Sequence, residues 1–100
     1  MKALLIKPTD QSIEAIDVSG KDQIIALVGY DTVIEDEVGD AGDKLHFDEE
    51  CFLRGTAGRF QIDSMIPVSG VGVVCGSTDS GELADVQTDI DDLKARTKFL

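Results

Sequence analysis

The sequence predicts an α+β fold, a small single domain over residues 1–100 with a mostly antiparallel sheet of five to six short strands and two short helices. Short apolar segments recur along the chain, some alternating with polar residues, and they are separated by turn residues such as Gly, Pro, Ser and Asp. Two other segments carry apolar residues at helical spacing. Hydrophobic residues make up 42% of the 100 residues, which is enough for one small core.

The chain begins with a predicted β-hairpin. Residues 2–7 are an apolar run that ends at Pro8, which is typical of a strand. Residues 9–11 are suited to a turn. Apolar and polar residues then alternate from Ser12, so residues 12–18 are expected to form the second strand of the hairpin.

Residues 21–28 predict the first helix. Ile24 and Val28 are four residues apart, so they would share one face of a helix, with Ile25 beside them. Gly29 follows directly and is suited to the left-handed conformation in which many helices end.

The middle of the chain predicts four more strands, over residues 31–38, 44–48, 59–62 and 71–75. In the first of these, Val33 and Ile34 are expected to face the core. In the second, Leu45 and Phe47 alternate with polar residues, so His46 is expected at the surface. The segments between these strands are rich in turn residues and are expected to form loops.

The end of the chain predicts the second helix. Thr88 is expected to cap it by accepting a hydrogen bond from the amide of Asp91, and Ile90, Leu93 and Phe99 would share its apolar face. The order of charges supports a helix, because the helix dipole favours anions in the first turn and cations in the last. The acidic residues are Asp89, Asp91 and Asp92, and the basic residues are Lys94, Arg96 and Lys98.

Acidic residues are numerous and unevenly distributed. The net charge is −11, and between residues 31 and 50 there are nine carboxylates with Lys44 as the only Lys or Arg. Such clustering repels nucleic acid and attracts basic protein surfaces, so we expect a protein partner with a basic surface and no direct binding of nucleic acid. The predicted partner-binding residues are Glu35, Asp36, Glu37, Asp40, Asp43, Asp48, Glu49 and Glu50. The alternative is that the charge serves only solubility.

No sequence motif indicates catalysis, so we expect a protein that is not an enzyme and has no cofactor. Ser69, Cys51 and Cys75 are conceivable nucleophiles, but the sequence places no base beside any of them. The glycine-rich segment 70–76 has Cys75 where a phosphate-binding loop has its third glycine, and no helix follows it. A strand with close-packed neighbours is the preferred interpretation of that segment.

A metal site is not predicted, although one alternative stays open. Asp36, Asp40 and Asp43 offer oxygen ligands on a glycine-containing loop, which suits a divalent-cation-binding module. The pattern of an EF-hand is absent, and a solvated acidic loop is the preferred interpretation. Cys51 and Cys75 form no zinc-binding motif and are expected to be free thiols in a reducing compartment.

The sequence also predicts a cytosolic protein without a membrane partner. No apolar run approaches the roughly 20 residues needed to span a bilayer. The apolar run at the beginning of the chain is too short for the core of a signal peptide.

Six stretches of the chain carry a resemblance to known sequences: MKALLIKP at 1–8, GYDTV at 29–33, DEECFLRG at 48–55, RF at 59–60, PVSGVGVV at 67–74 and TDIDDLKARTKFL at 88–100. They resemble an uncharacterised family of small domains found in phages and mobile elements. The resemblance implies no catalytic residues, because that family has no established active site.

The chain as a whole also resembles phage-encoded anti-CRISPR proteins directed at the type I-F surveillance complex. Its small size, its acidity and its lack of enzymatic motifs are similar to those of that group. The resemblance implies a stoichiometric inhibitor in the host cytoplasm that docks on the CRISPR RNA-guided complex, on its Cas7-type backbone and Cas8-type subunits, and prevents hybridisation of target DNA. An acidic adaptor or inhibitor of another host DNA-binding protein is the alternative. The contact residues named above come from charge alone.

Overall fold

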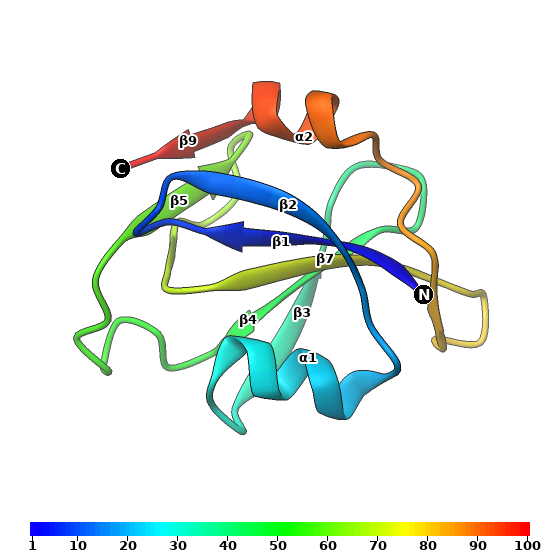
Figure 1. Cartoon of the computed structure of the whole chain (residues 1–100), viewed down its shortest axis with the longest axis horizontal. Coiled ribbons are helices and arrows are strands. Elements are labelled where there is room, and N and C mark those ends of the chain that lie inside the picture. The colour runs from blue at the N-terminus through cyan, green and yellow to red at the C-terminus, as the bar shows by residue number, and fades with distance from the viewer.

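A six-stranded antiparallel sheet forms the middle layer of the structure, a computed structural model that describes residues 1–100 (Figure 1). The order across this sheet is β2-β1-β7-β4-β3, and β8 pairs with the end of β7. The strands are β1 (Lys2–Lys7), β2 (Ser12–Asp17), β3 (Val33–Glu37), β4 (Lys44–Asp48), β7 (Gly72–Ser77) and β8 (Leu83–Ala84). All neighbouring strands are antiparallel, so the predicted fold class is confirmed.

Different elements cover the two faces of this sheet. Helix α1 (Lys21–Val28) covers one face. Helix α2 (Ile90–Arg96) and a second, three-stranded sheet cover the other. The second sheet has the order β6-β5-β9, with β5 (Arg59–Ile62), β6 (Val68–Ser69) and β9 (Thr97–Phe99). The sequence pattern did not indicate β6, β8 or β9.

The alternation of side chains along β1 divides the core into two clusters. Leu4 and Ile6 belong to the larger cluster, which lies under the second sheet and α2. Leu5 belongs to the smaller cluster, together with Ile24 and Val28 of α1. Successive side chains of a strand point to opposite faces, so one apolar strand can supply both clusters. The continuous apolar run at the start of the chain is therefore explained by burial on both sides.

Strand β7 lies at the centre of the sheet, and two of its glycines lie against close neighbours. A side chain at Gly72 would meet the Phe60 ring at 2.7 Å and Leu45 at 2.9 Å. A side chain at Gly76 would overlap the backbone carbonyl of Asp85. The interpretation of this glycine-rich segment as a close-packed strand is thus confirmed.

Helix α1 has the predicted bounds and the predicted end. Gly29 adopts the left-handed conformation with φ of 94°, and its N–H donates to the Ile25 carbonyl at 2.8 Å. No basic residue lies in the last turn of this helix.

Helix α2 differs from its prediction at both ends. The cap is Asp89, whose side chain accepts from the Asp91 amide, so the prediction that Thr88 caps the helix was wrong. The helix ends at Arg96, and the last residues pair with β5 as strand β9. Phe99 therefore lies on a strand opposite Phe60, a partner that local spacing could not reveal.

Two predicted exposures were also wrong. His46 is 1% exposed, because β4 is an inner strand between β3 and β7 and α1 packs on the same side as His46. Ile34 is 37% exposed. It lies next to Val33 on the edge strand β3, so its side chain faces the side of the sheet opposite to that of Val33.

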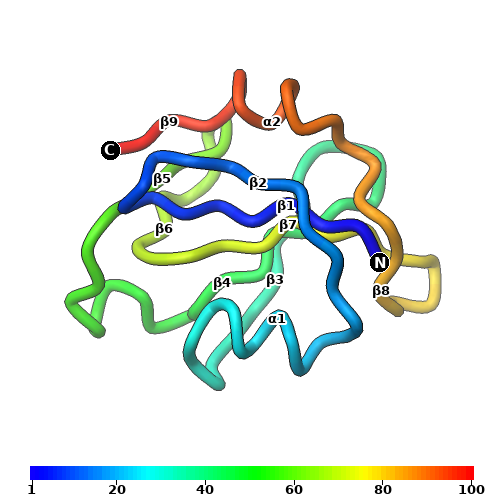
Figure 2. Tube along the Cα trace, viewed as in Figure 1, coloured from blue at the N-terminus to red at the C-terminus, as the bar shows by residue number.

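The segment between β8 and α2 lies beside the beginning of β1, as the trace in Figure 2 shows. Val86 N–H donates to the Lys2 carbonyl at 2.9 Å, and Lys2 N–H donates to the Asp85 carboxylate at 2.8 Å. These contacts join residues more than 80 positions apart and hold the segment between β8 and α2 against the main sheet.

Candidate functional site: an acidic edge and a neighbouring pocket

Strand β3 carries three of the predicted contact residues along one edge of the main sheet. Glu35, Asp36 and Glu37 are exposed, and β3 pairs only with β4. Their partners across the strand pair are His46, Leu45 and Lys44, respectively. Leu45 points into the larger core cluster, so Asp36 lies on that face, while Glu35 and Glu37 lie on the α1 face. Three consecutive carboxylates therefore belong to two faces, and only the edge of the strand presents all of them.

The loop after β3 carries two Asp residues, Asp40 and Asp43, whose surroundings differ. Asp40 is exposed and forms no ion pair. Asp43 is completely buried, and its carboxylate accepts from the backbone amides of Gln87 at 2.9 Å and Thr88 at 2.7 Å. The Thr88 hydroxyl also donates to it. Asp43 is thus an internal anchor for the segment before α2, and its predicted exposure to a partner was wrong.

Asp48 is a second buried anchor. It is 3% exposed and accepts hydrogen bonds from the Thr32 hydroxyl, from the Glu50 amide at 3.1 Å and from Arg54 Nε at 3.1 Å. Burial is the largest influence on the pKa of Asp48 and raises it, but these donors together outweigh burial and hold the pKa below its usual value. The carboxylate is engaged inside the fold, so its predicted role in partner contact was also wrong.

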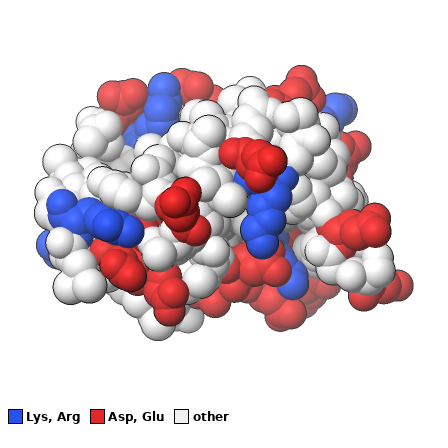
Figure 3. Space-filling view, turned by 90° about the horizontal axis from the view of Figure 1, so that it is seen from below, with Lys and Arg blue, Asp and Glu red and all other residues white.

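Six of the eight predicted residues remain at the surface. We call them the acidic edge: Glu35, Asp36, Glu37, Asp40, Glu49 and Glu50. Glu35 pairs with Lys44 at 3.5 Å and Glu50 with Arg54 at 3.8 Å, whereas the other four have no ion-pair partner. Figure 3, which shows the molecule from the side of α1, displays many acidic groups with a few basic side chains among them.

His46 is an unusual buried group beneath this edge. Neither ring nitrogen has a hydrogen-bond partner, and Nδ1 lies 3.7 Å from a carboxylate oxygen of Glu35. Burial is the main cause that lowers the pKa of His46, Glu35 opposes it, and Lys21 and Lys44 add to the lowering. We therefore expect a neutral imidazole at neutral pH.

The conceivable nucleophiles are all buried. Cys51 Sγ accepts from the Ser69 amide at 3.5 Å, and Ser69 Oγ donates to the Thr56 carbonyl at 2.8 Å. Burial raises the pKa of the Cys75 thiol. His46 forms no hydrogen bond to any of them. No pair of nucleophile and base is assembled among these residues.

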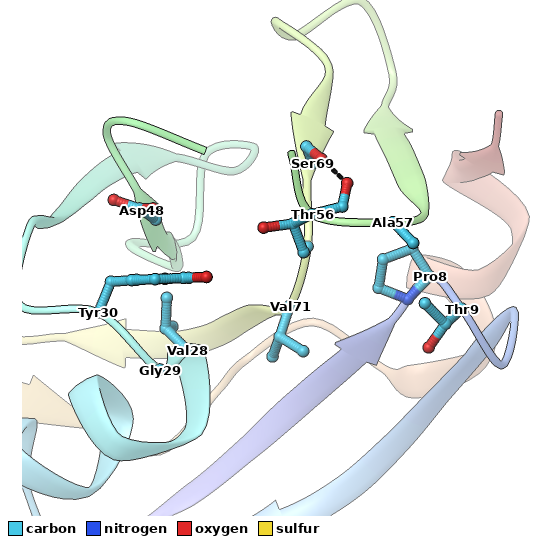
Figure 4. A pocket seen from close by; sticks show the side chains of 11 residues that line it. Pro8, Thr9, Val28, Gly29, Tyr30, Asp48, Thr56, Ala57, Ser69 and Val71 are labelled. Atoms are coloured by element: carbon cyan, nitrogen blue, oxygen red, sulfur yellow. Dashed lines mark hydrogen bonds between the residues drawn. The ribbon is translucent and has the colours of Figure 1, made fainter. Parts of the chain in front are cut away.

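A pocket of about 290 Å³ lies between the end of α1 and the loop after β4 (Figure 4). Four separate segments form its walls, together with Asp48 at one side: the turn after β1, the end of α1, the loop after β4 and the β6–β7 connection. The residues of these segments are Pro8, Thr9, Val28, Gly29, Tyr30, Thr56, Ala57, Ser69, Gly70 and Val71. Sequence reasoning missed this pocket, because none of the four segments carries a motif by itself.

Comparison of the chain with known protein families, with curated proteins and with solved structures finds no match. A proposal for the function of this chain therefore has to rest on the arrangement of its own residues.

No three of the chain's His, Cys, Asp and Glu side chains converge as a metal site would require, and both oxygens of Asp43 are engaged with protein donors. Neither helix is long and apolar enough to cross a membrane.

Proposed function

We propose that this protein is a stoichiometric, non-catalytic inhibitor of the type I-F CRISPR RNA-guided surveillance complex. It binds a basic surface of the complex in the host cytoplasm and prevents target DNA from hybridising with the guide. The observation that carries this proposal is the acidic edge, with six exposed carboxylates of which four have no ion-pair partner in the chain. The resemblance to phage-encoded anti-CRISPR proteins supplies the choice of partner.

The chemistry of DNA binding explains how such a surface inhibits. RNA-guided complexes hold nucleic acid in channels lined by Lys and Arg. A folded protein whose carboxylates occupy these cations excludes the DNA phosphates, and hydrogen bonds from Arg to carboxylates are strong and geometrically selective. Because β3 presents its carboxylates on two faces, the partner contacts the strand from its edge.

A second role for these carboxylates follows from their position. Charged side chains on an edge strand hinder pairing with the edges of other sheets. That role requires no partner at all, so the test must measure inhibition directly.

The test uses purified type I-F complex and a fluorescently labelled target DNA. Added before the DNA, the protein is expected to abolish DNA binding at a fixed molar ratio and to elute together with the complex in size-exclusion chromatography. Added after the DNA, it is expected to act much more slowly, because the basic surface is already occupied. Unchanged DNA binding without co-elution would refute the proposal.

The second candidate is an inhibitor or adaptor of another DNA-binding host protein, which the same exposed carboxylates favour. Affinity capture from host lysate, followed by mass spectrometry, distinguishes the two. A single basic DNA-binding protein, with the surveillance complex absent from the eluate, would favour the second candidate.

A further inference from the structure

Exposed aromatic and apolar side chains lie on and beside the loop after β4, the green loop at the left of Figure 1. Leu53 is 83% exposed and Phe52 is 50% exposed. Tyr30, shortly before β3, is exposed as well, whereas the other aromatic residues of the chain are buried or partly buried. We call the exposed residues and the two arginines that contact them the aromatic patch: Tyr30, Phe52, Leu53, Arg54 and Arg59.

Contacts between side chains join the members of this patch. The Arg54 guanidinium lies 4.3 Å from the centre of the Tyr30 ring. The Arg59 guanidinium lies 5.2 Å from the centre of the Phe52 ring. Such cation–π contacts are attractive, so they favour one position of each ring. Because Phe52, Leu53 and Arg54 are consecutive, the five residues are neighbours on one surface.

The backbone of the loop is anchored to the interior of the fold. The buried Asp48 carboxylate accepts from the Glu50 amide at 3.1 Å, and the Leu53 N–H donates to the Glu50 carbonyl at 2.9 Å. Between them, Cys51 is buried, and its Sγ accepts from the Ser69 amide at 3.5 Å. The loop therefore presents its exposed side chains from a fixed backbone, and such a surface loses less conformational entropy when it binds.

The composition of the patch is that of an interface core. Aromatic residues and Arg are enriched at protein interfaces, and a few such residues carry most of the binding energy. The chain has only five aromatic residues and three Arg, and the aromatic patch holds two of each. Phe52 and Leu53 belong to neither core cluster, so their apolar surface is not used by the fold.

The charges around the patch select among possible occupants. Glu49 and Glu50 are exposed in the same loop and belong to the acidic edge, so the patch continues that surface. A second copy docked through the same residues would oppose its own carboxylates to these. An anionic membrane would be repelled by a chain with a net charge of −11. A basic protein surface that contains an apolar pocket complements both the carboxylates and the apolar side chains.

We infer that the aromatic patch is the apolar anchor of the partner interface, and that Phe52 and Leu53 enter an apolar pocket within the partner's basic surface. The carboxylates of the acidic edge provide steering and orientation, whereas the anchor provides affinity that salt does not screen. This inference rests on the proposed function for the identity of the partner.

The experiment is biolayer interferometry of single variants on immobilised surveillance complex at several salt concentrations. Phe52→Ser and Leu53→Ser are each expected to weaken binding at least about tenfold, by the same factor at low and at high salt, because an apolar contact is not screened by ions. Ile66→Ser is the matched control. Ile66 is 75% exposed on the loop between β5 and β6, and its replacement is expected to stay within about threefold of the wild type.

Thermal unfolding accompanies each variant, and the largely exposed Leu53 is expected to be replaced without loss of the fold. Light scattering of the wild type and of Leu53→Ser tests the remaining occupant, and both are expected to be monomers. A wild-type dimer that Leu53→Ser dissociates would assign the patch to a second copy and overturn the inference.

The outcomes separate this inference from the proposed function. Wild-type binding that neither Phe52→Ser nor Leu53→Ser weakens would overturn the inference and leave the proposed function standing. An equal loss for Ile66→Ser, or a loss confined to low salt, would also overturn the inference alone. Absence of binding by the wild type would refute the proposed function, and the inference with it.

Discussion

Asp40 and Asp43 lie three residues apart in the loop after β3, and their surroundings differ completely. Asp40 points into solvent, whereas Asp43 is fully buried and accepts three hydrogen bonds from Gln87 and Thr88. A buried carboxylate is tolerated only where donors replace its hydration. The donors to Asp43 lie about 45 residues later in the chain. Local sequence patterns do not reveal such a distant partner, so both residues were predicted to be surface charges.

We predict that Asp43→Ala lowers the free energy of unfolding by about 2–4 kcal/mol, because the donors of Gln87 and Thr88 lose their acceptor in a buried position. Asp40→Ala is the matched control and should change stability by less than about 0.5 kcal/mol. Urea denaturation followed by circular dichroism measures both. Similar stabilities of the two variants would contradict the role of Asp43 as an anchor.

We also predict that His46 makes stability depend on pH below neutrality. The unfolded chain takes up a proton near the ordinary histidine pKa of about 6.5, whereas the folded chain, with its lowered pKa, takes it up only at lower pH. Stability is therefore full above about pH 6.5 and falls as the pH decreases through the folded pKa. The groups that act on the ring are Glu35 on β3, Lys21 on α1 and Lys44 on β4.

Unfolding of the wild type and of His46→Gln between pH 5 and pH 8 measures this effect. His46 is the only histidine in the chain, so the variant should have a flatter profile over the lower half of this range. Parallel profiles of the two proteins would refute the prediction.

At the scale of elements, β7 determines how the layers fit together. It pairs with β1, β4 and β8, and its glycines let the Phe60 ring and the backbone of Asp85 come close. The sequence identified this strand from its apolar run, and it identified α1 from local spacing and from Gly29. It did not identify β9, because that short strand is defined by its pairing with β5.

We predict that Gly76→Ala destabilises the fold by about 1–3 kcal/mol or more, because the added methyl group meets backbone and cannot be relieved by a side-chain movement. Gly20→Ala is the control. Gly20 has no atom near the added methyl group, its backbone is extended, and only the cap of α1 is affected, at a cost of about 0.5–1 kcal/mol. Thermal unfolding of both variants provides the comparison, and a smaller loss for Gly76→Ala would contradict the close packing of β7 against Asp85.

At the scale of the whole molecule, partner binding could depend on the overall net charge or on the local charge of the acidic edge, and two sets of charge reversals distinguish these explanations. Reversal of Asp36, Glu37 and Asp40 to Lys removes unpaired carboxylates from the acidic edge. Reversal of Asp17, Asp79 and Glu82 to Lys changes the net charge equally at exposed positions elsewhere. We predict that the first variant binds the surveillance complex at least about tenfold more weakly and loses salt dependence, while the second stays within about threefold of the wild type.

Competition of each variant with target DNA at several salt concentrations gives the affinities. Equal loss in the two variants would mean that overall charge governs binding. An unchanged affinity of the first variant would exclude the acidic edge as the contact surface.

The sequence by itself determined the acidity of the protein, the α+β class, the bounds of α1 and most of the strands of the main sheet. These properties depend on composition and on spacing between near neighbours, which the sequence displays directly. Only the tertiary structure decided that Asp43, His46 and Asp48 are buried and that four distant segments enclose a pocket. The physical reason is that burial and convergence arise from pairing between segments far apart in the chain, and local patterns carry no information on which segments will meet.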